Sequence, residues 1–189
     1  MKKYVYLWTM MCFAVAFFSC GSDSDDNEEV DEAWKLQNEQ AFADKAFDAA
    51  FTRYLSLSSS GALYYKQITP GNGKRIYYNS RAEVYYEGSF IDGTVFDKRD
   101  AAEYQIPFKV AISAAVSNYN ATSATGYTSG VIQGWIEILQ FMTEGEEGEV
   151  WIPQEMAYGT TWDYAKTIPP YSTLIFKIKI SKVIWIDEI

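Results

Sequence analysis

The chain of 189 residues carries 25 acidic and 16 basic residues, for a net charge of −9, and 48% of its residues are hydrophobic. This composition fits a folded protein of one domain with appendages, and the negative charge argues against binding to nucleic acid. Histidine is absent and both cysteines, Cys12 and Cys20, lie near the N-terminus, which excludes histidine-dependent nucleophiles, His-ligated metal sites and a disulfide framework in the body of the chain.

The N-terminal residues have the pattern of an export signal. Residues 1–3 are Met-Lys-Lys, and residues 4–18 form an uncharged apolar run that is shorter than the ~20 residues of a membrane-spanning helix. The run ends in Phe-Phe-Ser-Cys-Gly at 17–21, which resembles a bacterial lipobox. We therefore predict a lipoprotein signal peptide over 1–19 and a lipid anchor on Cys20, with an ordinary signal peptide as the alternative.

Two further segments precede the expected domain. Residues 20–32 are dominated by Asp, Glu and Ser, a composition that predicts a solvated acidic linker. Residues 33–57 contain neither Gly nor Pro, and their aromatic residues and alanines recur at helical spacing, which predicts an N-terminal amphipathic helix. We expect its aromatic stripe to pack on the protein's own domain, with a partner-binding face as the alternative.

The remainder of the chain has the pattern of strands with one short helix. Turn signals occur at 70–73, which read Pro-Gly-Asn-Gly, and at Asp92-Gly93. The predicted strands cover residues 63–69, 82–91, 107–112, 150–153 and 173–186, and the helix covers residues 134–142. This order predicts the α+β class, with an antiparallel sheet packed against one helix.

Three segments of this region resemble motifs of the FKBP-type peptidyl-prolyl isomerases. Residues 84–97 read VYYEGSFIDGTVFD, where the family has V-x-Y-x-G-x-L-x-D-G-x-x-F-D. Residues 131–135 read VIQGW, which matches the family's V-I-x-G-W at the start of its helix. The third segment comprises three short matches, namely AYG at 157–159, IPP at 168–170 and TLIF at 173–176. The resemblance implies an FKBP-like domain over 61–189, with its sheet wrapped on one short helix.

The resemblance also implies an aromatic substrate pocket that needs no cofactor and no metal. The residues it implies for catalysis are Tyr86, Phe96, Asp97, Trp135, Tyr158 and Phe176. Those it implies for substrate binding are Phe108, Val131, Ile132 and Ile168. Trp135 would be the floor under the proline ring, and Asp97 would orient the site beside Tyr86. The Tyr158 hydroxyl would donate to the substrate backbone. Taken singly, each aromatic residue would be interpreted as core.

Two stretches depart from the family pattern. Residues 111–130 are an insert rich in Ala, Ser, Thr and Asn, where the family has a short connection. A long loop of this kind either acts at the pocket mouth or is a tolerated surface insertion, and the sequence leaves both open. The loop 160–167 lacks the family's usual glycine and carries Trp162 and Tyr164, a change expected to affect substrate preference more than the fold.

The sequence thus predicts a peptidyl-prolyl cis–trans isomerase that assists the folding of exported or envelope proteins, because X-Pro bonds isomerise slowly during folding. The expected partners are proline-containing polypeptides and a membrane reached through lipidated Cys20, which places the protein in the cell envelope, at the outer membrane. A non-catalytic FKBP-like binding module is the alternative. The helix over 33–57 resembles N-terminal segments of bacterial homologues that dimerise, so the sequence allows a homodimer.

Overall fold

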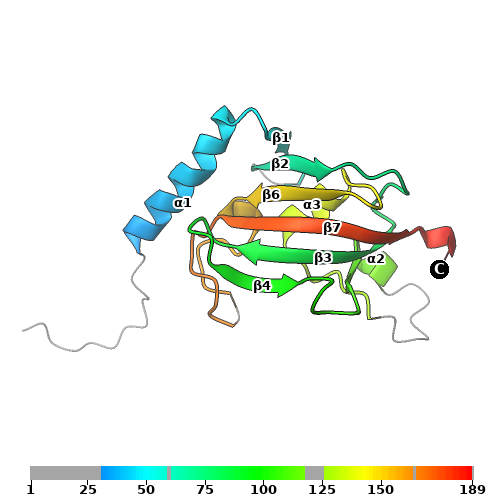
Figure 1. The fold of residues 1–189 in the computed structure, drawn as a ribbon. Helices are drawn as coiled ribbons and strands as arrows, with labels where there is room; N and C mark the ends of the chain where they lie inside the picture. The colour runs from blue at the N-terminus through cyan, green and yellow to red at the C-terminus, as the bar shows by residue number, and fades with distance from the viewer. Residues whose placement is uncertain (1–30, 59–60, 118–125, 164, 189) are drawn as a thin grey trace, which may run out of the picture.

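The computed structural model describes residues 31–58, 61–117, 126–163 and 165–188, and its centre is one antiparallel sheet (Figure 1). The seven strands have the order β1-β2-β6-β7-β3-β4, and β5 pairs with β3 beside β4. Their bounds are β1 Thr52–Leu55, β2 Ala62–Thr69, β3 Arg81–Ser89, β4 Val95–Arg99, β5 Phe108–Ala111, β6 Glu147–Ile152 and β7 Leu174–Ile184. The prediction of an α+β fold with an antiparallel sheet is confirmed.

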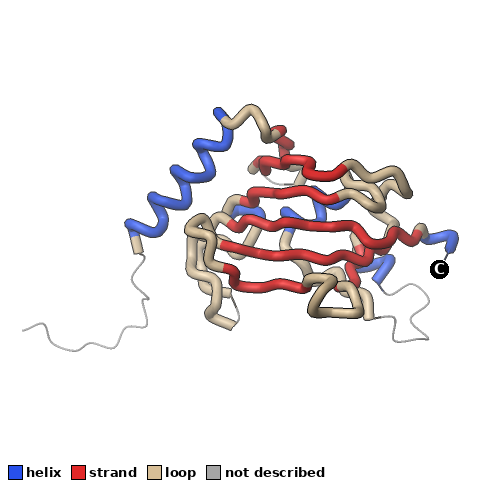
Figure 2. The backbone as a smooth tube through the Cα atoms, viewed as in Figure 1, coloured by secondary structure: helices blue, strands red, loops and turns tan. Residues whose placement is uncertain are grey.

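The helical elements lie outside the sheet (Figure 2). They are α1 Glu32–Asp44, α2 Ala114–Ser117 and α3 Gln133–Leu139, with 3-10 turns at Lys45–Phe47, Gln154–Met156 and Ile186–Glu188. The predicted helix at 134–142 corresponds to α3, which packs against one face of the sheet. None of the helices within these described ranges is long and apolar enough to cross a bilayer.

The central strand β7 shows how the sequence builds the core. Its residues alternate, with Phe176, Ile178 and Ile180 buried, and Lys177 and Lys179 exposed. This period of two turns one face of the strand to the core and the other to solvent. The buried residues pack with side chains of α3 in a single cluster that includes Trp135, Ile138 and Leu139. The sheet and α3 therefore share one hydrophobic core.

The predicted helix over 33–57 is wrong in its second half. The carboxylate of Asp31 caps α1 by accepting the backbone N–H groups of Ala33 and Trp34, both at 3.0 Å. The helix itself ends at Asp44. After the following 3-10 turn, Asp48 accepts the N–H of Ala50 at 3.1 Å, a local bond that competes with helix continuation. The chain then forms β1 at the edge of the sheet.

The structure bears on only part of the other predictions for the N-terminal region, because residues 1–30 lie outside the described ranges. Asp31 and Glu32, assigned to the acidic linker, are the cap and the first residue of α1. The signal segment 1–19, Cys20 and the rest of the linker lie outside the described residues.

Strand β4 has no counterpart among the predicted elements. The sequence predicts only the turn at Asp92-Gly93 that precedes it.

A buried carboxylate ties α3 to the segment after β1. Glu137 is 9% exposed, and its Oε1 atom accepts from the hydroxyls of Ser56 and Ser58 at 2.7 and 2.5 Å and from Gln133 Nε2 at 3.0 Å. Burial alone would raise the pKa of Glu137, but these donors outweigh it and hold the pKa below its ordinary value.

This arrangement gives a pH-dependent contribution to stability. Because the folded-state pKa of Glu137 is lowered, the contribution is present above the ordinary value of 4.5 and is lost as pH falls through the folded-state pKa. Glu137→Gln is expected to lower the free energy of unfolding at pH 7 by about 1 kcal/mol, and the difference from wild type should narrow towards pH 3. Urea unfolding at several pH values measures this, with exposed Glu39→Gln as the control. A difference that stays constant with pH would contradict the assignment.

Candidate active site

A pocket of about 140 Å³ lies between the sheet and the N-terminal end of α3. Its lining combines aromatic rings, branched aliphatic side chains and one carboxylate. The lining residues are Tyr86, Phe96, Asp97, Phe108, Gly130, Val131, Ile132, Trp135, Tyr158 and Phe176. All of them except Gly130 were singled out from the sequence. Segments up to 90 residues apart in the chain therefore converge on one pocket.

Trp135 lies at the centre of this arrangement. It is 3% exposed and sits in the first turn of α3. The rings of Tyr86 and Phe176 meet it edge to face, with centroids 5.1 and 5.2 Å away, and Phe108 does so at 6.2 Å. Gly134 allows this position, because a Cβ there would lie 2.4 Å from Ile152 Cγ2. The indole is thus a rigid surface at the base of the pocket.

The walls formed by Phe96 and Phe176 depend on a glycine in β3. The two rings meet at 5.6 Å and 89°. A Cβ on Gly88 would lie 2.7 Å from the Phe176 ring and 2.8 Å from the Phe96 ring. The glycine of the first sequence motif therefore lets both rings close over the strand.

The polar part of the pocket is a hydrogen bond between neighbouring strands. Gly88 in β3 is opposite Asp97 in β4, so Tyr86, two residues before Gly88, is a diagonal neighbour of Asp97. The Tyr86 hydroxyl donates to Asp97 Oδ2 at 2.6 Å. Burial, and then the Asp97 carboxylate, raise the pKa of Tyr86 well above its ordinary value. The hydroxyl therefore stays protonated and holds the carboxylate at the edge of the aromatic surface.

Tyr158 lies at the rim, on a loop that is organised by Asp163. Its side chain is 43% exposed, and burial, followed by the charges of Asp163 and Asp97, raises the pKa of its hydroxyl. Asp163 accepts the backbone N–H groups of Thr167 and Ile168, both at 2.6 Å. Burial would raise the pKa of Asp163, but these donors outweigh it and lower the pKa. The hydroxyl of Tyr158 is thus a protonated donor at the entrance.

Ile168 is the predicted substrate-binding residue that the structure does not place in the pocket lining. It is 4% exposed and belongs to the hydrophobic core. Its backbone carbonyl also accepts from Asp163 N at 3.3 Å. Ile168 is thus a buried residue of the loop, fixed by backbone hydrogen bonds to both the carboxylate and the backbone N–H of Asp163.

Gly130 is the lining residue that sequence reasoning missed. It ends the insert 111–130, and Thr128, two residues earlier, is bound to β5: Thr128 N donates to Lys109 O at 3.1 Å and Ala111 N donates to Thr128 O at 2.8 Å. A glycine carries no chemical group that could mark it as part of a site. Its position directly before the VIQGW motif was the available signal. The middle of the insert, residues 118–125, lies outside the described residues.

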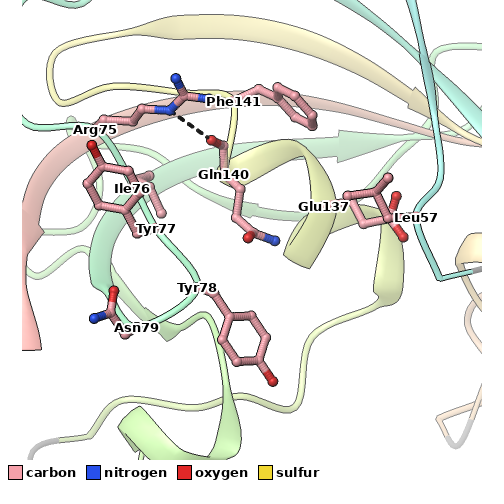
Figure 3. Close-up of a pocket in the computed structure, with 9 residues that line it drawn as sticks. All are labelled: Leu57, Arg75, Ile76, Tyr77, Tyr78, Asn79, Glu137, Gln140 and Phe141. Atoms are coloured by element: carbon pink, nitrogen blue, oxygen red, sulfur yellow. Dashed lines mark hydrogen bonds between the residues drawn. The ribbon is translucent and has the colours of Figure 1, made fainter.

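A larger hollow, of about 740 Å³, lies elsewhere on the surface (Figure 3). It is lined by Leu57, Arg75, Ile76, Tyr77, Tyr78, Asn79, Glu137, Gln140 and Phe141, none of which was predicted as a site residue. Its charged groups have partners within the fold: Arg75 Nε donates to Gln140 O at 3.4 Å, and Glu137 is bound by the two serines described above. The smaller aromatic pocket is therefore the candidate active site.

The sheet wrapped on one helix and the aromatic pocket define the FKBP class. Residues 73–181 match the family model described as FKBP-type peptidyl-prolyl cis-trans isomerase. The chain belongs to this family. Its N-terminal helix α1 lies outside the matched range.

Several curated proteins are similar to the chain. The FKBP-type 22 kDa peptidyl-prolyl cis-trans isomerase of Escherichia coli is 35% identical over 127 residues, which cover 67% of this chain and 52% of that protein. The probable FKBP-type peptidyl-prolyl cis-trans isomerase FkpA of Neisseria meningitidis is 32% identical, with 86% of this chain and 48% of that protein covered. The outer membrane protein MIP of Legionella longbeachae is 36% identical, with 64% and 44% covered. The chain spans about half the length of these relatives.

Two solved structures share the fold. The crystal structure of FkpA from Escherichia coli has a TM-score of 0.62 at 25% identity and covers 82% of this chain and 61% of that chain. A peptidyl-prolyl cis-trans isomerase from Pseudomonas syringae pv. tomato has a TM-score of 0.60 at 24% identity, with 86% and 98% covered. The second likeness concerns the fold alone.

Proposed function

We propose that the aromatic pocket catalyses cis–trans isomerisation of X-Pro bonds in polypeptides, and that the protein thereby assists the folding of exported or envelope proteins. The observation that carries the proposal is the buried Trp135 surface with the Tyr86–Asp97 hydrogen bond at its edge. Family membership and relatives named as isomerases support it.

The physical chemistry of the reaction suits such a pocket. Rotation about the peptide bond is opposed by amide resonance, with a barrier of ~18–20 kcal/mol. An apolar surrounding disfavours the planar, charge-separated amide relative to the twisted one, and a shape that fits the twisted form lowers the barrier further. Neither a nucleophile nor a metal takes part. A cavity of roughly 150 Å³ holds a benzene-sized ring, so about 140 Å³ accommodates a proline ring.

The proposed roles follow from the positions of the side chains. Trp135 supports the proline ring, and Asp97, held by Tyr86, faces the twisting amide. The backbone N–H of Ile132 and the hydroxyl of Tyr158 donate to substrate carbonyls. The apolar walls and rim are Tyr86, Phe96, Phe108, Val131 and Phe176. Ile168 acts through the loop that carries Tyr158.

Tyr158→Phe tests the role of the rim hydroxyl. The variant removes one neutral hydrogen bond to the substrate, which contributes about 1 kcal/mol, so kcat/KM should fall about fivefold. Exchange NMR on a short X-Pro peptide with the full chain measures this. Tyr78→Phe, which alters an exposed tyrosine of the larger hollow, should leave the rate unchanged.

The same experiment separates the enzyme from the binding module. Acceleration by the wild-type chain supports the isomerase. If the folded chain binds the peptide but does not accelerate its isomerisation, the protein is a binding module and the catalytic roles proposed above are wrong.

We also propose that the chain is anchored in the outer membrane through a lipid on Cys20. The lipobox-like sequence at 17–21 supports this, as does the similarity to a protein named outer membrane protein MIP. Cys20→Ala should release the protein from the membrane fraction and remove incorporation of labelled fatty acid. Trp34 and Phe42 of α1, whose aromatic stripe could serve a homodimer, contact Phe90 and Tyr64 of the same chain, so dimerisation has less support than the anchor.

A further inference from the structure

Helix α1 is bound to the segment that leads into β7, and its central contact is a buried asparagine. Asn38 is 0% exposed. Its Oδ1 accepts the backbone N–H of Thr173 at 2.8 Å, while the hydroxyl of Thr173 donates to Asn38 O at 3.3 Å. Asn38 Nδ2 donates to Trp34 O at 2.9 Å. The side-chain amide therefore joins the helix to a residue 135 positions further along the chain.

Two neighbours of Asn38 on α1 contact the same segment. Trp34 Nε1 donates to Ser172 Oγ at 3.2 Å, and that hydroxyl donates in turn to Pro169 O at 2.7 Å. The ammonium group of Lys35 lies over the ring of Tyr171, 4.8 Å from its centroid. Three residues of α1 thus contact the segment 169–173, by three hydrogen bonds and one cation–π contact.

The backbone of this segment is strained at the point of contact. Tyr171 has a φ of +63°, a conformation that costs energy for a residue with a Cβ and persists only where the surroundings impose it. Tyr171 N donates to Gly159 O at 2.9 Å, and the ammonium group of Lys35 lies over its ring. The helix therefore supplies part of the constraint that keeps Tyr171 in this state.

The segment is continuous with the pocket. Gly159, the partner of Tyr171, directly follows the rim residue Tyr158, and Thr173 precedes the wall residue Phe176 by three positions. A second connection runs through aromatic rings: Trp34 meets Phe90 at 5.6 Å, and Phe90 meets the wall residue Phe96 at 4.9 Å. Helix α1 thus reaches both the rim and a wall of the pocket without lining it.

We infer that α1 is part of the substrate-binding apparatus and that Asn38 is a positioning residue, which fixes the rim of the pocket through Thr173. This inference rests on the proposed function, because it concerns the affinity of the same site for an X-Pro polypeptide. Docking of α1 holds residues 169–173 and, through the Tyr171–Gly159 bond, residues 157–159 in the arrangement that places Tyr158 at the rim of the pocket. Loss of the contact leaves the floor and the Tyr86–Asp97 pair intact and releases the rim.

The test is Asn38→Ala in the full chain, with Gln40→Ala as the matched control. Gln40 carries the same amide group but is exposed, and its Nε2 donates to Asp44 Oδ1 at 2.7 Å within the helix. Asn38→Ala should raise KM for an X-Pro peptide about fivefold while kcat stays within twofold of wild type, and Gln40→Ala should change neither. A variant that merely lost stability would lower apparent kcat at constant KM.

Hydrogen exchange gives a readout that does not depend on activity. Asn38→Ala should speed exchange of the backbone amides at 168–176 about tenfold, and Asn38→Asp, which keeps an acceptor for Thr173 N–H, should restore part of the protection. If Asn38→Ala fails to fold, Trp34→Phe replaces it. That variant keeps a ring against Phe90 but loses the indole N–H, and should raise KM about twofold.

The outcomes separate the inference from the proposed function. Wild-type KM and wild-type exchange in Asn38→Ala, or unchanged values in Trp34→Phe where that variant is used, would overturn the inference. A wild-type chain without turnover would remove the proposed function, and the exchange comparison would still decide whether Asn38 fixes the rim. Faster exchange with unchanged KM and peptide affinity would show a structural contact only, which also overturns the inference.

Discussion

Asp97→Ala should lower kcat/KM for isomerisation of an X-Pro peptide about tenfold. The substitution removes the acceptor of the Tyr86 hydroxyl and the carboxylate that lines the pocket. A hydrogen bond to a charged group contributes about 1.5–3 kcal/mol. Because Asp97 is exposed in the unliganded chain, the lower end applies, and about 1.4 kcal/mol corresponds to a factor of ten. Exchange NMR on a peptide of fixed sequence measures the rate.

Two comparisons make this result specific. Asp97→Asn keeps an oxygen that accepts from Tyr86, so its rate should lie between those of wild type and Asp97→Ala. Asp92→Asn changes an aspartate in the preceding turn, whose Oδ1 accepts Thr94 N at 2.8 Å, and should leave the rate unchanged. A rate for Asp97→Ala equal to that of wild type would show that the carboxylate has no part in the reaction.

Gly88→Ala should lower the free energy of unfolding by about 2 kcal/mol. The added Cβ would lie 2.7 Å from the Phe176 ring and 2.8 Å from the Phe96 ring, far inside van der Waals contact, and overpacking of this kind costs about 1–3 kcal/mol. Both rings must shift, so the peptide should also bind more weakly. Urea unfolding and peptide titration measure the two effects separately.

A second-site change tests the cause of that destabilisation. Phe96→Leu opens space beside Gly88, so the double variant Gly88→Ala, Phe96→Leu should be more stable than the sum of the two single effects predicts. Strictly additive free energies would mean that the clash with Phe96 is not the source of the loss.

The sequence predicted most residues of the pocket lining because most of them lie in short motifs with fixed spacing. Tyr86, Gly88, Phe96 and Asp97 fall within a single run of 14 letters, and a hairpin brings them together. Periodicity was weaker where local bonds compete with it. Alanines and aromatic residues continue at helical spacing beyond Asp44, yet the Asp48 turn and the pairing of β1 with β2 decide the structure there.

The contacts of α1 were beyond what the sequence alone could predict. An asparagine in a helix has no pattern that points to a partner, and Asn38 acquires its importance only from Thr173 in the distant segment before β7. Ile168 presents the converse case, since it matches a motif and is buried in the core cluster, but it is not among the residues that line the pocket. Motif spacing identifies which residues correspond to those of the family, whereas the place of each side chain in the fold depends on the loop that carries it.

The place of β7 in the sheet determines when the sheet and the pocket can be completed during folding. This strand comes after the other six in the chain but lies in the middle, between β6 and β3, and it carries Phe176 of the pocket. The two halves of the sheet therefore stay apart until residues 174–184 are available, and non-local pairing of this kind is slow. A chain that crosses a membrane from its N-terminus would remain open, and suited to threading, until β7 had also been delivered.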